Sequence, residues 1–260
     1  MDGLQKFLPL SEKVPVEETL DCIRFVEHNR NKETVRQYVE SVMPFGEKAS
    51  LKYRRRFFER FIETEGNDIV YTPLLKFINE ITNYQSKKEV LYYITCIKHI
   101  CIGECVKSFA KGDLPGEISS KDLLEYFRIR MPEAKESSVE KTFNVVVNIL
   151  KDFGVINAVN DKVSNEKRYK LNWNIRPTNE ALVFCLYYEF RKIRDNKMPR
   201  ADVLLNAEVF KYFLMSEPLI NKYLKWMMDE GYIENYVMGD NSQYQFSYDS
   251  LEQLVEKVVK

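Results

Sequence analysis

The chain has few glycines, prolines, cysteines and histidines, and it has no net charge. Its 260 residues include nine glycines, nine prolines, five cysteines and two histidines, and 39 basic residues balance 39 acidic ones. An odd number of unevenly spaced cysteines is not typical of a secreted, disulfide-bonded domain, so we expect a cytoplasmic protein. The longest unbroken apolar run, Ala181–Tyr188, has eight residues, whereas a membrane-spanning helix needs roughly 20. We therefore expect no membrane segment, and the first residues, Met1–Leu4, do not resemble a signal peptide.

Sequence patterns typical of enzymes are missing as well. The sequence has no Gly-rich phosphate loop and no GxSxG, HExxH or paired CxxC motif. Three cysteines and His99 lie between residues 96 and 105, but inside one apolar segment and without a second pair of ligands, so we expect buried thiols there. We predict no catalytic residues, no metal and no cofactor, and we do not expect a small-molecule substrate.

The composition predicts a folded, mainly α-helical chain. Hydrophobic residues make up 45% of the sequence and aromatic residues 13%, which is enough to build a core. In the first half, apolar periodicity predicts helices near residues 16–29, 32–43, 49–65, 72–83 and 87–111, and nothing there has the pattern of a strand. The Gly- and Pro-containing break at residues 111–116 predicts a domain boundary, with an N-terminal helical domain over 1–112 and a C-terminal domain over 113–260.

The second half alternates helices with short β-hairpins. Helices are expected near residues 120–130, 137–153, 178–195, 201–214, 216–230 and 249–259, and hairpins at 155–159 with 168–172 and at 232–237 with 243–248. Ser137 followed by Glu140 predicts a capping box at the start of the second helix.

A helix, a glycine stop and a hairpin occur twice in this half. Gly154 ends the first helix and Gly231 the second, a spacing of 77 residues (231 − 154). This order is typical of winged helix-turn-helix folds, which usually bind nucleic acid. We therefore predict two winged-helix-like units, over about residues 117–175 and 176–260.

The strongest charge pattern lies on the helix predicted over 49–65. Between residues 30 and 60 nine basic residues, Arg36 among them, face four acidic ones, an excess of +5 (9 − 4). At about 100° per residue, five cations fall on one arc of the helix, and Leu51 and several phenylalanines fall on the opposite arc. The predicted phosphate-binding cations of this arc are Lys48, Lys52, Arg55, Arg56 and Arg60, and Arg36 is a further predicted DNA-binding residue. Arg54 points toward the apolar arc, where we expect a salt bridge. A solvated helix face with local ion pairs is the alternative.

The helix predicted over 137–153 offers a second candidate surface. It turns Lys141, Asn144, Asn148 and Lys151 to one side. Asn can pair with adenine, and Lys can reach guanine or phosphate. In the following hairpin, Lys162, Lys167 and Arg168 are expected to contact phosphates. The second unit presents Asn221, Lys222 and Lys225, but its hairpin turn at 238–242 has no cation and could pack against the rest of the chain.

Several of these stretches resemble the BrxA family, accessory proteins of BREX bacteriophage-defence systems. The resemblance rests on Arg36–Val39 through Phe45–Ser50, on the arginine-rich helix that follows, on Leu150–Ile156 and on Phe246–Glu252, and it extends over about residues 18–255. It implies an N-terminal helical bundle similar to the RNA-binding NusB fold, followed by winged-helix-like elements. It also implies binding of double-stranded DNA and a role in phage defence beside a methyltransferase and other BREX proteins.

We therefore expect a non-enzymatic, cytoplasmic DNA-binding accessory protein whose contacts are mainly to the phosphate backbone. One alternative is a protein-interaction adaptor, with Trp226, Tyr232 and Tyr236 as exposed anchors. A second alternative is an RNA-binding or transcription-linked factor. A basic helix and a first winged unit that share one face would favour DNA binding over the adaptor.

Overall fold

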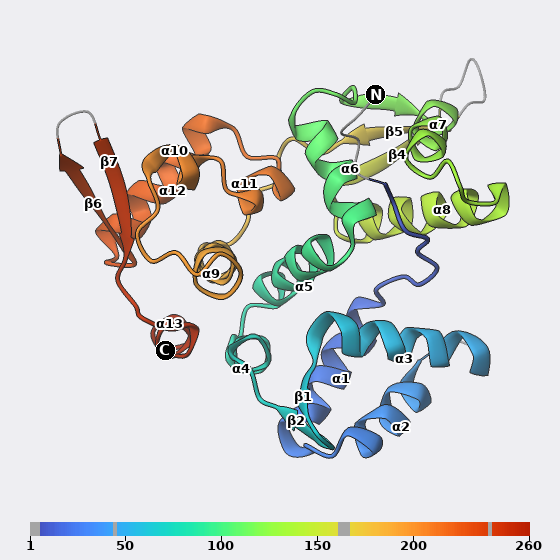
Figure 1. The fold of residues 1–260 in the computed structure, drawn as a ribbon, viewed down its shortest axis with the longest axis horizontal. Helices are drawn as coiled ribbons and strands as arrows, with labels where there is room; N and C mark the ends of the chain where they lie inside the picture. The colour runs from blue at the N-terminus through green and yellow to red at the C-terminus, as the bar shows by residue number, and fades with distance from the viewer. Residues whose placement is uncertain (1–5, 44–45, 161–166, 239–240) are drawn as a thin grey trace.

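The computed structural model describes residues 6–43, 46–160, 167–238 and 241–260 and confirms a mainly helical fold with short antiparallel hairpins (Figure 1). In this part of the chain, no helix is long and apolar enough to cross a membrane.

Among the described residues up to 110, six helices and a small hairpin form the first part of the fold. The elements are α1 (Val16–His28), α2 (Lys32–Val42), α3 (Glu47–Phe61), β1 (Glu63–Glu65), β2 (Asp68–Val70), α4 (Pro73–Glu80), α5 (Tyr84–Lys98) and α6 (Ile100–Ala110). The β1–β2 pair corrects the expectation that this region has no strand. Three-residue strands are too short to show a period of two, so the sequence pattern could not reveal them.

The helix predicted over 87–111 is two helices. His99 separates α5 from α6 in an extended conformation (φ −126°, ψ 99°). Gly103 explains how closely the two pack, because a Cβ atom there would lie 2.7 Å from the carbonyl oxygen of Cys96 and 3.0 Å from the Tyr212 hydroxyl. The five cysteines are buried and free, which confirms the prediction of buried thiols.

The remaining elements fall into two groups in which helices precede a β-hairpin, and we call them the first and second winged units. The first contains β3 (Glu117–Ser119), α7 (Ser120–Arg130), α8 (Glu136–Asp152), β4 (Ile156–Asn160) and β5 (Lys167–Leu171). The second contains α9 (Asn179–Tyr187), the π-helical η1 (Tyr188–Ile193), α10 (Ala201–Leu205), α11 (Glu208–Tyr212), α12 (Glu217–Asp229), β6 (Ile233–Met238) and β7 (Asn241–Phe246), and α13 (Leu251–Val258) follows. The helix predicted over 201–214 is thus split into α10 and α11, and α8 begins at Glu136, so Ser137 lies within the first turn and not at the cap.

Helices α8 and α12, which precede the hairpins of the two units, end in the same way. Gly154 and Gly231 have φ values of 75° and 73°, a left-handed conformation that costs glycine little. In the first unit the amide of Val155 donates to Leu150 O at 2.7 Å, and in the second the amide of Tyr232 donates to Met227 O at 2.8 Å. These are Schellman closures, and they confirm the two glycine stops predicted from the sequence.

The helices on the two sides of residue 112 share one hydrophobic core. Helix α5 packs against α9, and α6 packs against α11. The rings of Phe77 and Phe184 stack with centroids 4.4 Å apart, and the Tyr92 hydroxyl donates to Tyr212 O at 2.9 Å. The predicted division at residue 112 therefore falls inside a continuous core, and its meaning as a domain boundary stays a prediction.

Candidate nucleic-acid interface

Helix α3 has an apolar face, but its basic arc is not uniformly exposed. Tyr53, Phe57 and Phe61 are buried, as its pattern indicates. Leu51, which we placed on the buried arc, is 40% exposed, and Arg60, which we placed on the exposed arc, is only 2% exposed. The expected role of Arg60 in binding phosphate is therefore wrong.

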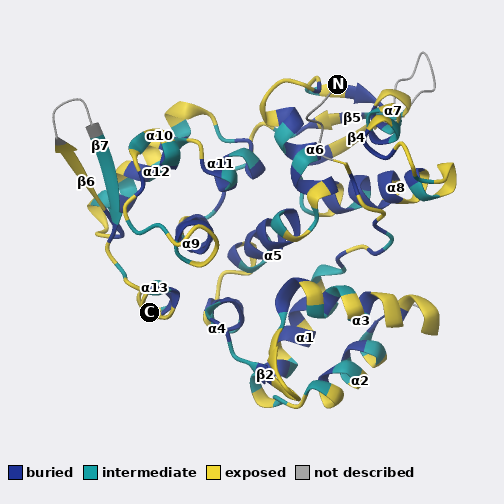
Figure 2. Cartoon of the chain, in the orientation of Figure 1, coloured by how far each residue is buried: buried dark blue, intermediate teal, exposed yellow. Residues whose placement is uncertain are grey.

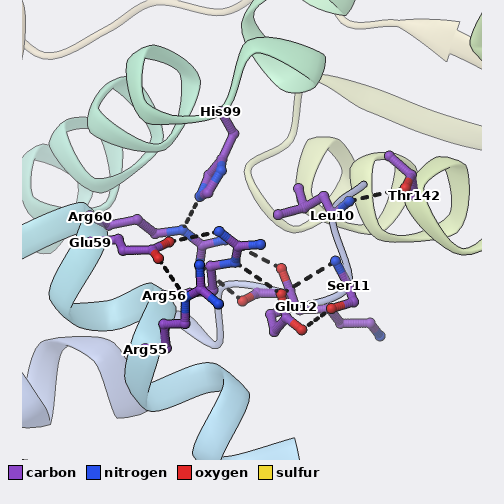
Figure 3. Close-up of polar contacts among 10 residues, drawn as sticks. Leu10, Ser11, Glu12, Arg55, Arg56, Glu59, Arg60, His99 and Thr142 are labelled. Carbon is purple, nitrogen blue, oxygen red and sulfur yellow. Dashed lines mark hydrogen bonds and ion pairs between the residues drawn. The ribbon is translucent and has the colours of Figure 1, made fainter. Parts of the chain in front are cut away.

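Arg60 instead holds the extended N-terminal segment, residues 6–15, against α3 (Figure 3). Its Nε donates to His99 Nε2 at 2.6 Å, its Nη1 to Lys13 O at 3.2 Å and its Nη2 to Glu12 O at 3.3 Å. Burial lowers the pKa of Arg60 to about 10. Burial and the neighbouring Arg60 lower the pKa of His99 to about 3, so His99 is neutral at pH 7 and its Nε2 accepts the hydrogen bond.

The other arginines of this region are neutralised by nearby carboxylates. Arg55 donates to Glu59 at 2.7 Å, while Arg56 reaches Glu59 at 2.6 Å and the buried Glu12 at 3.1 Å. Although burial alone would raise it, hydrogen bonds from both arginines lower the pKa of Glu59. Arg54 pairs with Glu40, which confirms the predicted salt bridge.

Arg36 also contacts other residues of this chain. It lies 3.3 Å from Glu33 and over the ring of Phe58, with 5.7 Å between the guanidinium carbon and the ring centroid. Local pairing thus takes up much of the positive charge that the sequence shows between residues 30 and 60.

Lysines from two helices surround one hollow of about 350 Å³. Lys48 and Lys52 come from α3, Lys141 from α8 and Lys13 from the N-terminal segment, which runs between the two helices (Figure 1). All four side chains are exposed, and none forms an ion pair with a described residue. Figure 2 shows exposed residues at the ends of α3 and α8 that lie on the same side of the view. The hollow is also lined by Glu12, whose carboxylate is held by Arg56.

The N-terminal segment fixes the position of α8 relative to α3. On the α8 side, the amide of Leu10 donates to Thr142 Oγ1 at 3.0 Å, and on the α3 side Arg60 binds the carbonyls of Glu12 and Lys13 (Figure 3). Lys13 was not predicted, because it lies in an extended segment with no helical periodicity.

The other predicted residues of α8 lie outside this hollow. Asn144 and Lys151 are exposed and Asn148 is half-buried. Because Lys151 is ten residues beyond Lys141, it lies about 15 Å further along the helix. The two lysines therefore mark opposite ends of one exposed edge of α8.

The hairpin of the first unit contributes less free charge than its sequence suggests. Arg168 lies 2.8 Å from Glu117 of β3, and the Lys167 ammonium lies 5.6 Å from the ring centroid of Tyr169. Lys162 falls outside the described residues. The strand β3, which we did not predict, lies next to β5 in the sheet order β3–β5–β4.

The aromatic anchors expected for an adaptor are mostly covered. Tyr232 is 8% exposed, which corrects its expected exposure, and Trp226 is half-buried. Tyr236 is 42% exposed, and the neighbouring Val237 is 67% exposed.

The comparisons with known proteins define the fold alone. No protein-family model and no curated protein matches the chain. The chain is similar to a crystal structure of magnesium ion-bound SspB, with a TM-score of 0.50 and 12% sequence identity over 96% of this chain and 87% of that one. The magnesium ion belongs to that protein. Among the described residues of this chain, no group of three or more His, Cys, Asp and Glu side chains is placed to hold a metal ion.

Proposed function

We propose that this protein binds double-stranded DNA as a non-enzymatic accessory protein of a bacterial phage-defence system. The observation that carries the proposal is the convergence of Lys48, Lys52 and Lys141 around one hollow. These side chains come from two helices about 90 residues apart in sequence, and each has an ammonium group not neutralised by any described carboxylate. The role in phage defence rests on the resemblance to the BrxA family.

The charge arrangement favours contacts to the phosphate backbone. A polyanion that meets several fixed cations releases condensed counterions, and this release favours binding without reading sequence. Because the arginines of α3 are already paired with carboxylates, the lysines account for most of the counterion release that favours binding. We therefore expect affinity to fall steeply with salt and to depend weakly on DNA sequence.

The first winged unit supports the same partner. Helix α6 precedes β3, and its Ser108 hydroxyl lies 2.9 Å from the Tyr126 hydroxyl of α7. The order α6–β3–α7–α8–β4–β5, with β5 central in the sheet, makes α8 the third helix of a winged helix-turn-helix, the one that commonly enters the major groove. Lys141 lies on this helix and lines the same hollow as Lys48 and Lys52 of α3.

The test is a fluorescence-anisotropy titration of a 20-bp duplex at 50 and 200 mM salt. We expect Lys48→Glu/Lys52→Glu/Lys141→Glu to weaken binding at least 100-fold, since three released counterions favour binding by about 500-fold at 0.1 M salt. Lys121→Glu/Lys257→Glu/Lys260→Glu makes the same change in charge at exposed positions outside the hollow and serves as the control. If both variants bind as tightly as the wild type, the proposed site is wrong. If the wild type does not bind DNA at low salt, the adaptor, with Tyr236 and Val237 exposed on its hairpin, becomes the better hypothesis.

A further inference from the structure

The second winged unit repeats the chain path of the first more fully than its sequence indicates. The segment before α10 pairs with β7 through an isolated bridge between Arg200 and Gln243, and so takes the place that β3 has beside β5 in the first unit. After each glycine the chain makes the same return contact, from the amide of Asn172 to Val155 O at 2.9 Å in the first unit and from the amide of Ser247 to Tyr232 O at 3.0 Å in the second. Helix α12 therefore occupies the place of α8.

The spacing of 77 residues aligns the two helices position by position. The buried residues Phe143, Val147 and Leu150 of α8 correspond to Ile220, Leu224 and Met227 of α12, which are also buried. Because the inward faces match, the outward faces match too. Asn144 corresponds to Asn221 (144 + 77) and Asn148 to Lys225 (148 + 77), and both residues of α12 are exposed.

One position differs in a way that favours α12 as a binding surface. Val145 is 6% exposed and lines the hollow beside the N-terminal segment, whereas its counterpart Lys222 (145 + 77) is exposed. Lys222 and Lys225 form no ion pair within the described part of the chain. The acidic Glu217 and Asp229 lie at the two ends of the helix, so the middle of its outer face is cationic.

We propose that the outer face of α12, with Asn221, Lys222 and Lys225, is a second binding site for double-stranded DNA. The two lysines bind phosphates, and the Asn221 amide reaches a base edge in the major groove. The hairpin β6–β7 extends beside α12 at the opposite end of the molecule from α8 and β4–β5 (Figure 1), and no residue of α12 lines the hollow, so this site is separate from it. The inference rests on the proposed function, because it extends the same partner class to a second surface.

The site is tested by titrating a short duplex of about 12 bp into the full-length protein at 50 mM salt. We expect the wild type to bind two duplexes, and Lys222→Glu/Lys225→Glu to bind one. The control Lys257→Glu/Lys260→Glu has the same spacing and the same change in charge, at the end of α13 and just beyond it, and should still bind two. When the α12 substitutions are added to the three hollow substitutions, we expect binding at the remaining site to weaken about 60-fold at 0.1 M salt. Each lost phosphate contact removes the release of one counterion, which contributes about eightfold to the affinity.

The outcomes separate this inference from the proposed function. The second site is wrong if the wild type binds one duplex, the hollow variant binds none and the α12 variant still binds one. The proposed function would stand in that case. A folded wild type that binds no duplex overturns both. Circular dichroism of each variant checks folding before the titration.

Discussion

Replacing Arg60 with methionine should destabilise the protein, although its sequence position suggests a surface contact. The side chain is 2% exposed and donates to His99 Nε2, Lys13 O and Glu12 O. Methionine fills similar space but donates to none of them, and each buried acceptor left without a donor costs roughly 1 kcal/mol or more. The expected loss is therefore about 3 kcal/mol of the free energy of unfolding.

The assay is urea unfolding at pH 7, followed by fluorescence and circular dichroism. For a slope of about 3 kcal/mol per molar urea, the midpoint should fall by about 1 M. The matched control is Lys52→Met on the same helix, because Lys52 is exposed and unpaired among described residues, so its substitution should change stability by less than about 0.5 kcal/mol. Equal midpoints for the two variants would refute the assignment of Arg60 as the residue that holds the N-terminal segment.

Two further predictions concern stability. First, the pKa of His99 is lowered to about 3 by burial and by Arg60, whereas an unfolded histidine has a pKa near 6.5. Between these values the unfolded chain binds a proton that the folded chain does not, so stability falls as pH falls, by about 2 kcal/mol from pH 7 to pH 5. Urea unfolding at both pH values checks this, and His99→Gln, which keeps an acceptor but does not titrate, should lose that part of the dependence; an unchanged dependence would contradict the prediction. Second, Gly103→Ala should cost about 1–3 kcal/mol, because its Cβ would lie 2.7 Å from Cys96 O. Gly46→Ala, with nothing within 4 Å of the new Cβ, should be nearly neutral in the same thermal or urea assay, and equal effects would count against the close packing of α5 and α6.

The parts of the fold that depend on local chemistry could be predicted from the sequence. Gly154 and Gly231 end their helices because the left-handed turn is a property of the residue itself. The buried faces of α3 and α8 could also be predicted, because helical periodicity is a property of the local sequence. The β1–β2 pair is local, but its strands are too short to show a periodicity, whereas β3 and the break at His99 depend on contacts with distant residues.

The candidate site was predictable only in part, because a helical wheel shows spacing and not neighbours. It placed Arg60 with Lys52, yet the N-terminal segment and His99 cover Arg60 and leave Lys52 exposed. It also counted Arg55 and Arg56 as free charges, although Glu59 and Glu12 neutralise them. Lys13 joins the site only because the chain folds back between α3 and α8.

The most direct test of the central claim, that α3 and α8 form one DNA-binding surface, is the salt dependence of DNA affinity in two single variants and their combination. Each phosphate contact contributes about 0.9 to the slope of log K against log salt concentration. We predict that Lys52→Ala and Lys141→Ala each reduce the slope by about 0.9 and that the double variant reduces it by about 1.8. A slope that changes with Lys52→Ala but stays at the wild-type value with Lys141→Ala would show that α8 is not part of the surface and would contradict the account.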